Sequence, residues 1–414
     1  MKRKIIIKLI AAVICCMLLL SSCGANDTSV EPETTGVPED TGKAETEKGG
    51  IETVDVTFES VDVTWESISD TTETDGTSDT AETTETTDEP VTTAPPETTP
   101  APETTKVLND TEAPFFLYNA YNVTLTRGKE FNIHKYISYI DDQDSDVELI
   151  VGGSVDTNTV GSYSLKLTLK DDAGNTSSSS LSVKIVEPAS SGSSGSSGTY
   201  TPEPARSFAD FTATYKRAGT MVGIDVSRWQ GEIDFNKVAS AGCEFVIMRI
   251  GGYADGVFED PCYAANIRNA KAAGLKVGIY WYSEENGAAA VRENASYLYS
   301  LLNGEKLDFP IFFDWEDYYN FEDYKMSVRD LNDMFLAFKD EAESRGYKAA
   351  LYNSKYFLGI LWSEEVKGDG VWLAHYIDET TYTGKFFLWQ QGLGSIDGIY
   401  GDVDVDVFYP DRMK

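Results

Sequence analysis

The sequence predicts a multidomain protein with a disordered N-terminal stalk, a middle all-β sandwich and a C-terminal α/β barrel. Three observations support this organisation. The first quarter of the chain is acidic and rich in Thr, Glu and Pro, the middle carries short strands of alternating polarity, and the last half alternates apolar strands with helical patterns. The expected boundaries are 1–22, 23–107, 108–187, 188–219 and 220–414.

The N-terminus carries the pattern of a secretory signal peptide. A basic segment, Met1–Lys4, precedes an apolar run from Ile5 to Leu20 that is too short for a membrane-spanning helix. The small residues before Cys23 resemble a bacterial lipobox, which implies a lipoprotein signal peptide over 1–22 and a lipid on Cys23. We therefore expect a protein anchored on the extracellular face of the bacterial cell membrane, reaching into the cell wall. A plain secreted protein with an incidental cysteine is the alternative.

Residues 23–107 are predicted to be an extended, disordered stalk. Between Ala25 and Thr105 the sequence has 22 acids and two lysines, so the segment repels itself and has little apolar surface to bury. A repeat of alternating apolar residues, Val54–Ser60 and Val61–Ser67, can pair as strands, but an isolated hairpin is marginal in water. We expect at most a transient docking segment there.

The segment 108–187 has the pattern of a β-sandwich. Short stretches alternate apolar and polar residues and are separated by glycine-containing turns. The predicted strands are Val123–Leu125, Val147–Val151, Tyr163–Leu169 and Leu181–Val186. The stretches Val160–Tyr163 and Asp171–Thr176 resemble the bacterial immunoglobulin-like domains of surface proteins, which implies a spacer and no particular activity.

Four aspartates lie close together in this segment: Asp141, Asp142, Asp144 and Asp146. Clustered carboxylates are the ligands that Ca²⁺ prefers, but an acidic surface loop has the same composition. We favour the surface loop, and whether the domain binds Ca²⁺ or glycan stays open. The Ser/Gly-rich stretch within 188–219 predicts a flexible linker.

Residues 220–414 are predicted to form an incomplete TIM-type barrel with about five βα units and a strand-rich end. The last three strands lie too close together in the sequence for full helices between them. The predicted strands are Met221–Val226, Phe245–Ile250, Lys276–Tyr282, Phe309–Trp315, Ala349–Tyr352, Val371–Tyr376, Phe386–Trp389 and Val403–Phe408. The predicted helices are Asp234–Ala241, Pro261–Ala273, Ala288–Leu302, Val328–Arg345 and Lys355–Trp362.

Acids and aromatic residues gather at the carboxyl ends of these strands, where such barrels carry their active sites. Asp314 and Glu316 are two residues apart, so on a strand they point to the same side, about 6–7 Å apart along the backbone. Carboxylates bind sugar hydroxyls, while aromatic rings stack on sugar faces. The further candidates for substrate binding are Asp225, Arg249, Tyr280, Trp281, Tyr282, Tyr352, Tyr376, Gln390 and Asp404.

Several motifs of this domain occur in the order found in the family 25 glycoside hydrolases, which the domain resembles. They are Gly223–Ser227 with Gln230–Gly231, Phe245–Arg249, Gly278–Tyr280, Asp314–Glu316, Trp372–Ala374, Trp389–Gln390 and Val403–Asp404. The resemblance covers 220–413 and implies a lysozyme that cleaves the β-1,4 bond between N-acetylmuramic acid and N-acetylglucosamine in peptidoglycan. It implies Glu316 as general acid, with Asp314 assisting, and Asp225, Asp404 and Tyr280 as further site residues. Asp406 stands where an asparagine is common in the family.

The part played by Asp314 stays open at this point. Cleavage of a glycoside needs a proton donor and a group that stabilises an oxocarbenium-like transition state. Asp314 can act as nucleophile, as base, or as the residue that orients the acetamide oxygen of the substrate. The Asp-x-Glu spacing resembles that of families with substrate assistance, which favours the last role and retention of configuration.

Two other functions are compatible with the sequence: a non-catalytic surface lipoprotein that binds glycan for adhesion, and a hydrolase of another N-acetylated glycan. The presence of all four rim acids (Asp225, Asp314, Glu316 and Asp404) favours an enzyme.

Composition argues against several other classes of protein. A net charge of −34 disfavours nucleic acid as a partner. The two histidines, His134 and His375, lie in different predicted domains and form no motif for a catalytic metal, so we expect neither metal nor cofactor in the active site. We expect a monomer. Cys243 and Cys262 can pair outside the cell or stay as free thiols.

Overall fold

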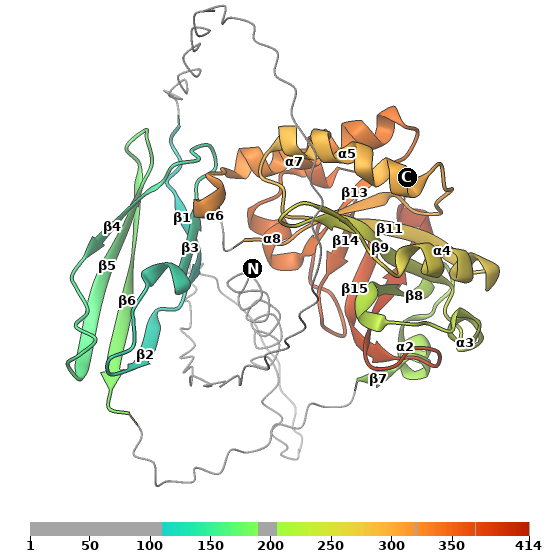
Figure 1. The fold of residues 1–414 in the computed structure, drawn as a ribbon, viewed down its shortest axis with the longest axis horizontal. Helices are drawn as coiled ribbons and strands as arrows, with labels where there is room; N and C mark the ends of the chain where they lie inside the picture. Colours follow the sequence, from blue (N-terminus) through green and yellow to red (C-terminus); the bar gives the residue numbers. More distant parts are fainter. Residues whose placement is uncertain (1–109, 189–204, 319–320, 369, 414) are drawn as a thin grey trace, which may run out of the picture.

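The computed structural model describes residues 110–188, 205–318, 321–368 and 370–413 (Figure 1). The predicted signal peptide, Cys23, the stalk over 23–107 and most of the predicted linker lie outside the described residues. Among the helices that are described, none has the length and apolar character needed to cross a membrane.

The predicted all-β sandwich is present and consists of two sheets. In the smaller sheet, β1 (Phe115–Asn119) pairs antiparallel with β3 (Ile137–Ile140). The larger sheet has the order β2-β6-β5-β4, with bounds Asn122–Thr126, Thr176–Val186, Gly161–Lys170 and Glu148–Gly152. Alternate residues of β5 and β6 are buried, so leucines of β5 face Leu181, Val183 and Ile185 of β6 in the core. Strands β1 and β3 were not predicted.

The C-terminal domain is built around an eight-stranded, barrel-like sheet. Strands β8, β9, β11, β12, β13, β14 and β15 pair in parallel, β16 pairs antiparallel with both β15 and β8, and β8 also pairs with β9, which closes the sheet on itself. Their bounds are Met221–Val226, Phe245–Tyr253, Lys276–Ser283, Ile311–Trp315, Ala349–Ser354, Val371–Ala374, Phe386–Ser395 and Val403–Phe408. All eight predicted strands are therefore present.

Helices follow the first five barrel strands and lie outside the sheet (Figure 1). They are α3 (Phe235–Ser240), α4 (Tyr263–Ala272), α5 (Ala288–Leu302), α6 (Phe321–Tyr324), α7 (Val328–Ser344), α8 (Lys355–Ile360) and α9 (Glu364–Lys367). Helix α7 begins with a capping box in which Ser327 and Asp330 bond each other's backbone N–H groups. From residue 371 to the end of β16 the described chain has strands and loops only, as the short spacing predicts.

The predicted linker 188–219 extends too far toward the C-terminus. Strand β7 (Arg206–Ser207) pairs with β15, and helix α2 (Phe208–Tyr215) follows it directly. Phe208 and Phe211 are buried in the barrel core. The barrel domain therefore begins near residue 205, because the two phenylalanines anchor this segment.

The barrel core has two layers. Aromatic side chains such as Phe245, Phe312 and Trp372 fill the interior of the sheet, while a larger apolar cluster lies between the strands and the helices. Glycine is required where strands approach closely: a Cβ on Gly252 would lie 2.2 Å from the backbone oxygen of Tyr282. The filled interior leaves the rim as the place for most polar side chains of the inner face.

The sandwich packs directly against the barrel through its smaller sheet. Leu117 and Ile140 are buried in the apolar cluster that surrounds the barrel strands. Ser138 Oγ donates a buried hydrogen bond of 2.8 Å to the backbone oxygen of Tyr318, close after β12. The first backbone N–H groups of α7, those of Val328 and Arg329, donate to the backbone oxygens of Asp141 and Asp142 over 2.9 and 3.1 Å. Figure 1 shows β1 and β3 beside α6.

Candidate active site

Four carboxyl groups converge at one end of the barrel. Asp225 and Asp314 are near the carboxyl ends of the parallel strands β8 and β12, and Glu316 follows β12. Strand β16 is antiparallel, so its first residues lie at that same end, and Asp404 stands directly opposite Asp225 in the ladder. Antiparallel pairing therefore brings Asp404 to the rim, beside Asp225.

Asp314 and Glu316 differ strongly in exposure. Asp314 is 6% exposed, whereas Glu316 is exposed just beyond the strand end. Burial raises the pKa of Asp314 well above its ordinary value, and the charges of Glu316 and Asp225 raise it further, while Arg249 lowers it. The buried Oδ1 of Asp314 has no hydrogen-bond partner among the described residues. Asp314 thus favours its neutral form and has an oxygen with capacity for one more hydrogen bond.

Gln390 on β15 holds Asp225 in place. Its Nε2 donates to Oδ2 of Asp225 over 2.8 Å. Its Oε1 accepts from the hydroxyl groups of Tyr352 and Tyr376 over 2.9 and 2.6 Å. These two bonds fix the orientation of the amide so that its N–H₂ faces Asp225. The structure therefore joins four predicted site residues in one hydrogen-bonded network.

Asp404 and Asp406 lie on the same face of β16. Burial raises the pKa of both carboxyl groups, and the charges of Asp225 and Glu316 raise that of Asp404 further. Asp406 is fully buried, and its Oδ1 accepts a 2.8 Å hydrogen bond from Nε1 of Trp372. Burial and then the charge of Asp406 raise the pKa of Asp225. We did not predict Asp406 as a site residue. It stands two residues after Asp404, and this spacing on a strand indicates that both side chains lie on the same face.

Arg249 is the buried cation of this region. It is 9% exposed on β9 and forms an ion pair with Asp260, with Nη2 2.7 Å from Oδ2. Its charge also lowers the pKa of Asp314 and of Tyr280. Asp260 was not predicted, because it follows β10 (Val257–Glu259), a short strand that extends the sheet beside β9. Arg249 therefore acts on Asp314 and Tyr280 through its charge, while Asp260 fixes its position.

The three aromatic residues at the end of β11 point to opposite sides of the sheet. Tyr280 and Tyr282 lie on the inner face: Tyr280 packs edge-on against Trp372, and Tyr282 donates a 2.8 Å hydrogen bond to Glu284. Trp281 is 2% exposed in the outer apolar layer and donates to Glu285 over 3.2 Å. The prediction that Trp281 contacts substrate is corrected to a packing role, because neighbouring residues of a strand alternate between faces.

One exposed aromatic residue was missed among the predicted candidates. Trp229 lies in the short helical turn η2 (Arg228–Gln230) directly after β8 and is 74% exposed. The guanidinium group of Arg228 lies 4.6 Å from its ring centroid and covers one side. An exposed indole four residues after Asp225 offers a stacking surface for a sugar ring. Its position immediately after a barrel strand was the available signal.

The described cysteines are unpaired, and the acids with the spacing of metal ligands lie in the other domain. Cys243 and Cys262 are free thiols, which settles the pairing that the sequence left open. Within the described residues, the groups of acids with the spacing of metal ligands lie in the sandwich domain. The rim itself combines an exposed acid, buried acids of raised pKa and tyrosine side chains, an arrangement suited to acid–base chemistry on a hydroxyl-rich substrate.

Two family models match parts of this chain. A family model described as "Glycosyl hydrolases family 25" matches residues 224–394, and one described as "Bacterial surface protein, Ig-like domain" matches residues 117–185. The autolytic lysozyme of Clostridium acetobutylicum is 27% identical over 191 residues, which cover 45% of this chain and 56% of that protein. This chain thus spans little more than half the length of that relative.

Two further similarities were found. The uncharacterized protein YegX of Escherichia coli O157:H7 is 30% identical over 219 residues, which cover 50% of this chain and 76% of that protein. The structure of a family 25 glycosyl hydrolase from Bacillus anthracis is 20% identical, with a TM-score of 0.41, and the match covers 47% of this chain and 89% of that one. Together, the family model and the similarity to YegX, of which this chain covers 76%, show that this chain belongs to glycosyl hydrolase family 25.

Proposed function

We propose that this chain is a cell-wall lysozyme that hydrolyses the β-1,4 bond between N-acetylmuramic acid and N-acetylglucosamine in peptidoglycan. Membership of family 25 supports a glycoside hydrolase, and the lysozyme name of one relative supports peptidoglycan as the substrate. The observation that carries the proposal is the pair of acids at the end of β12, in which an exposed Glu316 stands beside a buried Asp314 of raised pKa.

Glu316 is the general acid in this proposal. Its side chain is exposed, so it can reach the glycosidic oxygen of a polymer that lies across the rim. Proton transfer from a positioned carboxylic acid makes the departing sugar a better leaving group. Asp314 lies deeper and its Oδ1 has no partner among the described residues, so it can accept a hydrogen bond from the acetamide N–H of the sugar to be cleaved.

The reaction then proceeds in two steps. Glu316 gives its proton to the glycosidic oxygen, the bond from the anomeric carbon to that oxygen breaks, and the acetamide oxygen, oriented by Asp314, forms a bond to the anomeric carbon. Water next attacks that carbon, the acetamide bond is released, and the carboxylate of Glu316 takes the proton of the water. Two displacements at one carbon retain its configuration. Asp225, Asp404 and the tyrosines bind the sugar hydroxyls around this centre.

The experiment that tests this function is digestion of purified peptidoglycan, followed by borohydride reduction and mass spectrometry of the fragments. The proposal predicts reduced N-acetylmuramic acid at the new ends. Reduced glucosamine ends would identify a different bond, binding without cleavage would identify a glycan-binding protein, and activity on chitin oligomers alone would identify another N-acetylated glycan as the substrate.

We also propose that the enzyme is held at the outer face of the cell membrane by a lipid on Cys23. This rests on the basic, apolar and small-residue pattern of residues 1–23, which lie outside the described residues. A buried acyl chain contributes about 0.8 kcal/mol per CH₂, so several tens of methylenes retain a protein on a bilayer. Cys23→Ala should move the protein from the membrane fraction to the medium, and continued retention in the membrane would contradict the anchor.

A further inference from the structure

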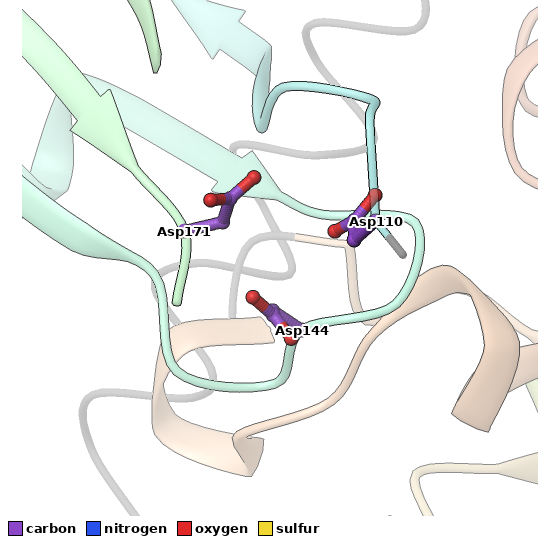
Figure 2. A group of neighbouring side chains, drawn as sticks. All are labelled: Asp110, Asp144 and Asp171. Atoms are coloured by element: carbon purple, nitrogen blue, oxygen red, sulfur yellow. The ribbon is translucent and has the colours of Figure 1, made fainter. Parts of the chain in front are cut away.

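Five aspartates meet at the end of the sandwich that docks on α7. Asp110 precedes β1, Asp141, Asp142 and Asp144 follow β3, and Asp171 follows β5. Figure 2 shows that Asp110, Asp144 and Asp171 extend from these three segments toward a common space. Candidate ligand oxygens of Asp110, Asp144 and Asp171 lie within 4.8 Å of one another, as do those of Asp110, Asp141 and Asp142.

Two of these side chains are buried and leave an oxygen unsatisfied. Asp141 is 0% exposed and Asp110 is 7% exposed. Oδ1 of Asp141 accepts from the backbone N–H groups of Gln143 and Asp144 over 2.8 and 2.7 Å, whereas its Oδ2 has no partner among the described residues. The same holds for Oδ2 of Asp110 and Oδ1 of Asp142. A buried carboxylate oxygen without a partner is costly, so these atoms point to a cation.

The neighbouring basic side chains are engaged elsewhere. Lys325 pairs with Asp146 over 3.4 Å, and Arg329 donates to the side-chain oxygen of Gln143. Among the ion pairs of the described residues, none includes a member of the five-aspartate cluster. The expectation of an acidic surface loop therefore holds for the exposed Asp146 and is wrong for Asp141, which is fully buried.

The arrangement matches the coordination of Ca²⁺. This ion takes six to eight oxygen ligands at about 2.3–2.6 Å, so ligands of one ion lie within about 5 Å of each other. Carboxylates from three separate segments satisfy that spacing here. Mg²⁺ demands a stricter octahedral geometry and keeps most of its water, which fits such a carboxylate-rich cluster less well.

We propose that Asp110, Asp141, Asp142, Asp144 and Asp171 bind Ca²⁺, and that the ion fixes the loop through which the sandwich docks on the barrel. The backbone oxygens of Asp141 and Asp142 accept hydrogen bonds from the first N–H groups of α7, so the residues that ligate the ion also hold the interface. The ion thus rigidifies the support of the segment that follows β12.

The test is a titration of the full chain with CaCl₂ at pH 7.5, followed by calorimetry and by thermal unfolding. We expect binding with a Kd on the order of 10⁻⁴ M, as in extracellular Ca²⁺ modules. At 10 mM CaCl₂ the sandwich should melt at least about 5 °C higher than in EDTA. No heat of binding, or an equal rise with NaCl of matched ionic strength, would overturn the proposal.

Asp141→Asn is the diagnostic variant, because its side-chain oxygen can still accept from Gln143 and Asp144. It should be at least as stable as the wild type in EDTA, since one buried charge is gone, and should lose the response to CaCl₂. The control Glu148→Gln, an exposed acid of the same domain, should keep the response. Lower stability of Asp141→Asn in EDTA together with an unchanged Ca²⁺ response would assign Asp141 a structural role only.

The effect on docking is measured by hydrogen exchange of the amides of Val328 and Arg329. Added CaCl₂ should slow their exchange at least about threefold in the wild type and leave it unchanged in Asp141→Asn, because the bond to the sandwich opens less often. Binding of Ca²⁺ without any change in this exchange would refute the link between the ion and the interface.

Discussion

The pH dependence of stability tests how the buried carboxyl group of Asp406, below the rim, is held. Asp406 is fully buried, and burial followed by the charge of Asp404 raises the pKa of its carboxyl group well above the ordinary value. An acid with a higher pKa in the folded state binds its proton more tightly when folded. Its stabilising contribution is complete below the unfolded pKa of about 3.9 and is lost as the pH rises through the folded pKa.

We expect Asp406→Asn to remove this loss. The asparagine oxygen can still accept from Nε1 of Trp372, which is 2.8 Å away in the wild type. In the window between the two pKa values each such acid lowers the free energy of unfolding by about 1.4 kcal/mol per pH unit. The wild-type curve should therefore fall more steeply than that of the variant by about this amount. Loss of the Asp406 charge also eases ionisation of Asp225, which acts in the same direction.

The assay is urea unfolding followed by tryptophan fluorescence, in half-unit steps from pH 4 to pH 7. Within the window between the two pKa values, each pH unit should widen the difference between Asp406→Asn and the wild type by about 1.4 kcal/mol. Asp402→Asn is the matched control, because this exposed acid immediately precedes the same strand, and it should keep the wild-type slope. Equal slopes for Asp406→Asn and the wild type would mean that Asp406 ionises alike in both states, which would refute the reasoning.

Two further predictions concern the interface and the rim. Ser138→Ala removes the buried bond to the backbone oxygen of Tyr318 and should lower the free energy of unfolding by about 1–3 kcal/mol in the same denaturant assay. The control Ser164→Ala, on an exposed face, should change it by less than about 0.5 kcal/mol. Equal effects of the two substitutions would mean that the interface bond contributes nothing to stability. Trp229→Ala should raise KM for peptidoglycan fragments about tenfold at unchanged stability, since a stacking contact is lost. Trp281→Ala should lower the free energy of unfolding by about 3–5 kcal/mol, because a buried side chain is removed. The reverse pattern in kinetics and unfolding would contradict the exposed position of Trp229 and the buried position of Trp281.

Elements with a strong local pattern were predictable from the sequence. Strands β8 and β16 and helix α5 have the predicted bounds, because each is a run of apolar periodicity between clear breakers. Helix α2 was missed, since its two anchoring phenylalanines follow a Ser/Gly-rich stretch whose composition dominates the prediction. The sequence does not predict the direction of β16, because strand direction depends on the connection and leaves no mark within the strand.

The candidate site was predictable to a similar degree. Acids near the ends of the predicted strands are the site candidates that the sequence offers. The barrel places these acids at one rim: Asp225, Asp314, Glu316 and Asp404. Alternation along β11 would have placed Trp281 on the outer face. The bond between Ser138 and Tyr318 could not be foreseen, because its partners are 180 residues apart and meet only after two domains dock.

The central claim is that Glu316 donates the proton while Asp314 assists without donating it. The most direct measurement compares Glu316→Gln and Asp314→Asn on peptidoglycan fragments and on an aryl glycoside with a good leaving group. Glu316→Gln should lose about 10²–10⁴-fold in kcat on the fragments and recover most of that loss on the aryl glycoside, which needs little protonation. Asp314→Asn should be slowed alike on both. Equal recovery of the two variants would contradict the assignment, and a fully active Glu316→Gln would contradict the site itself.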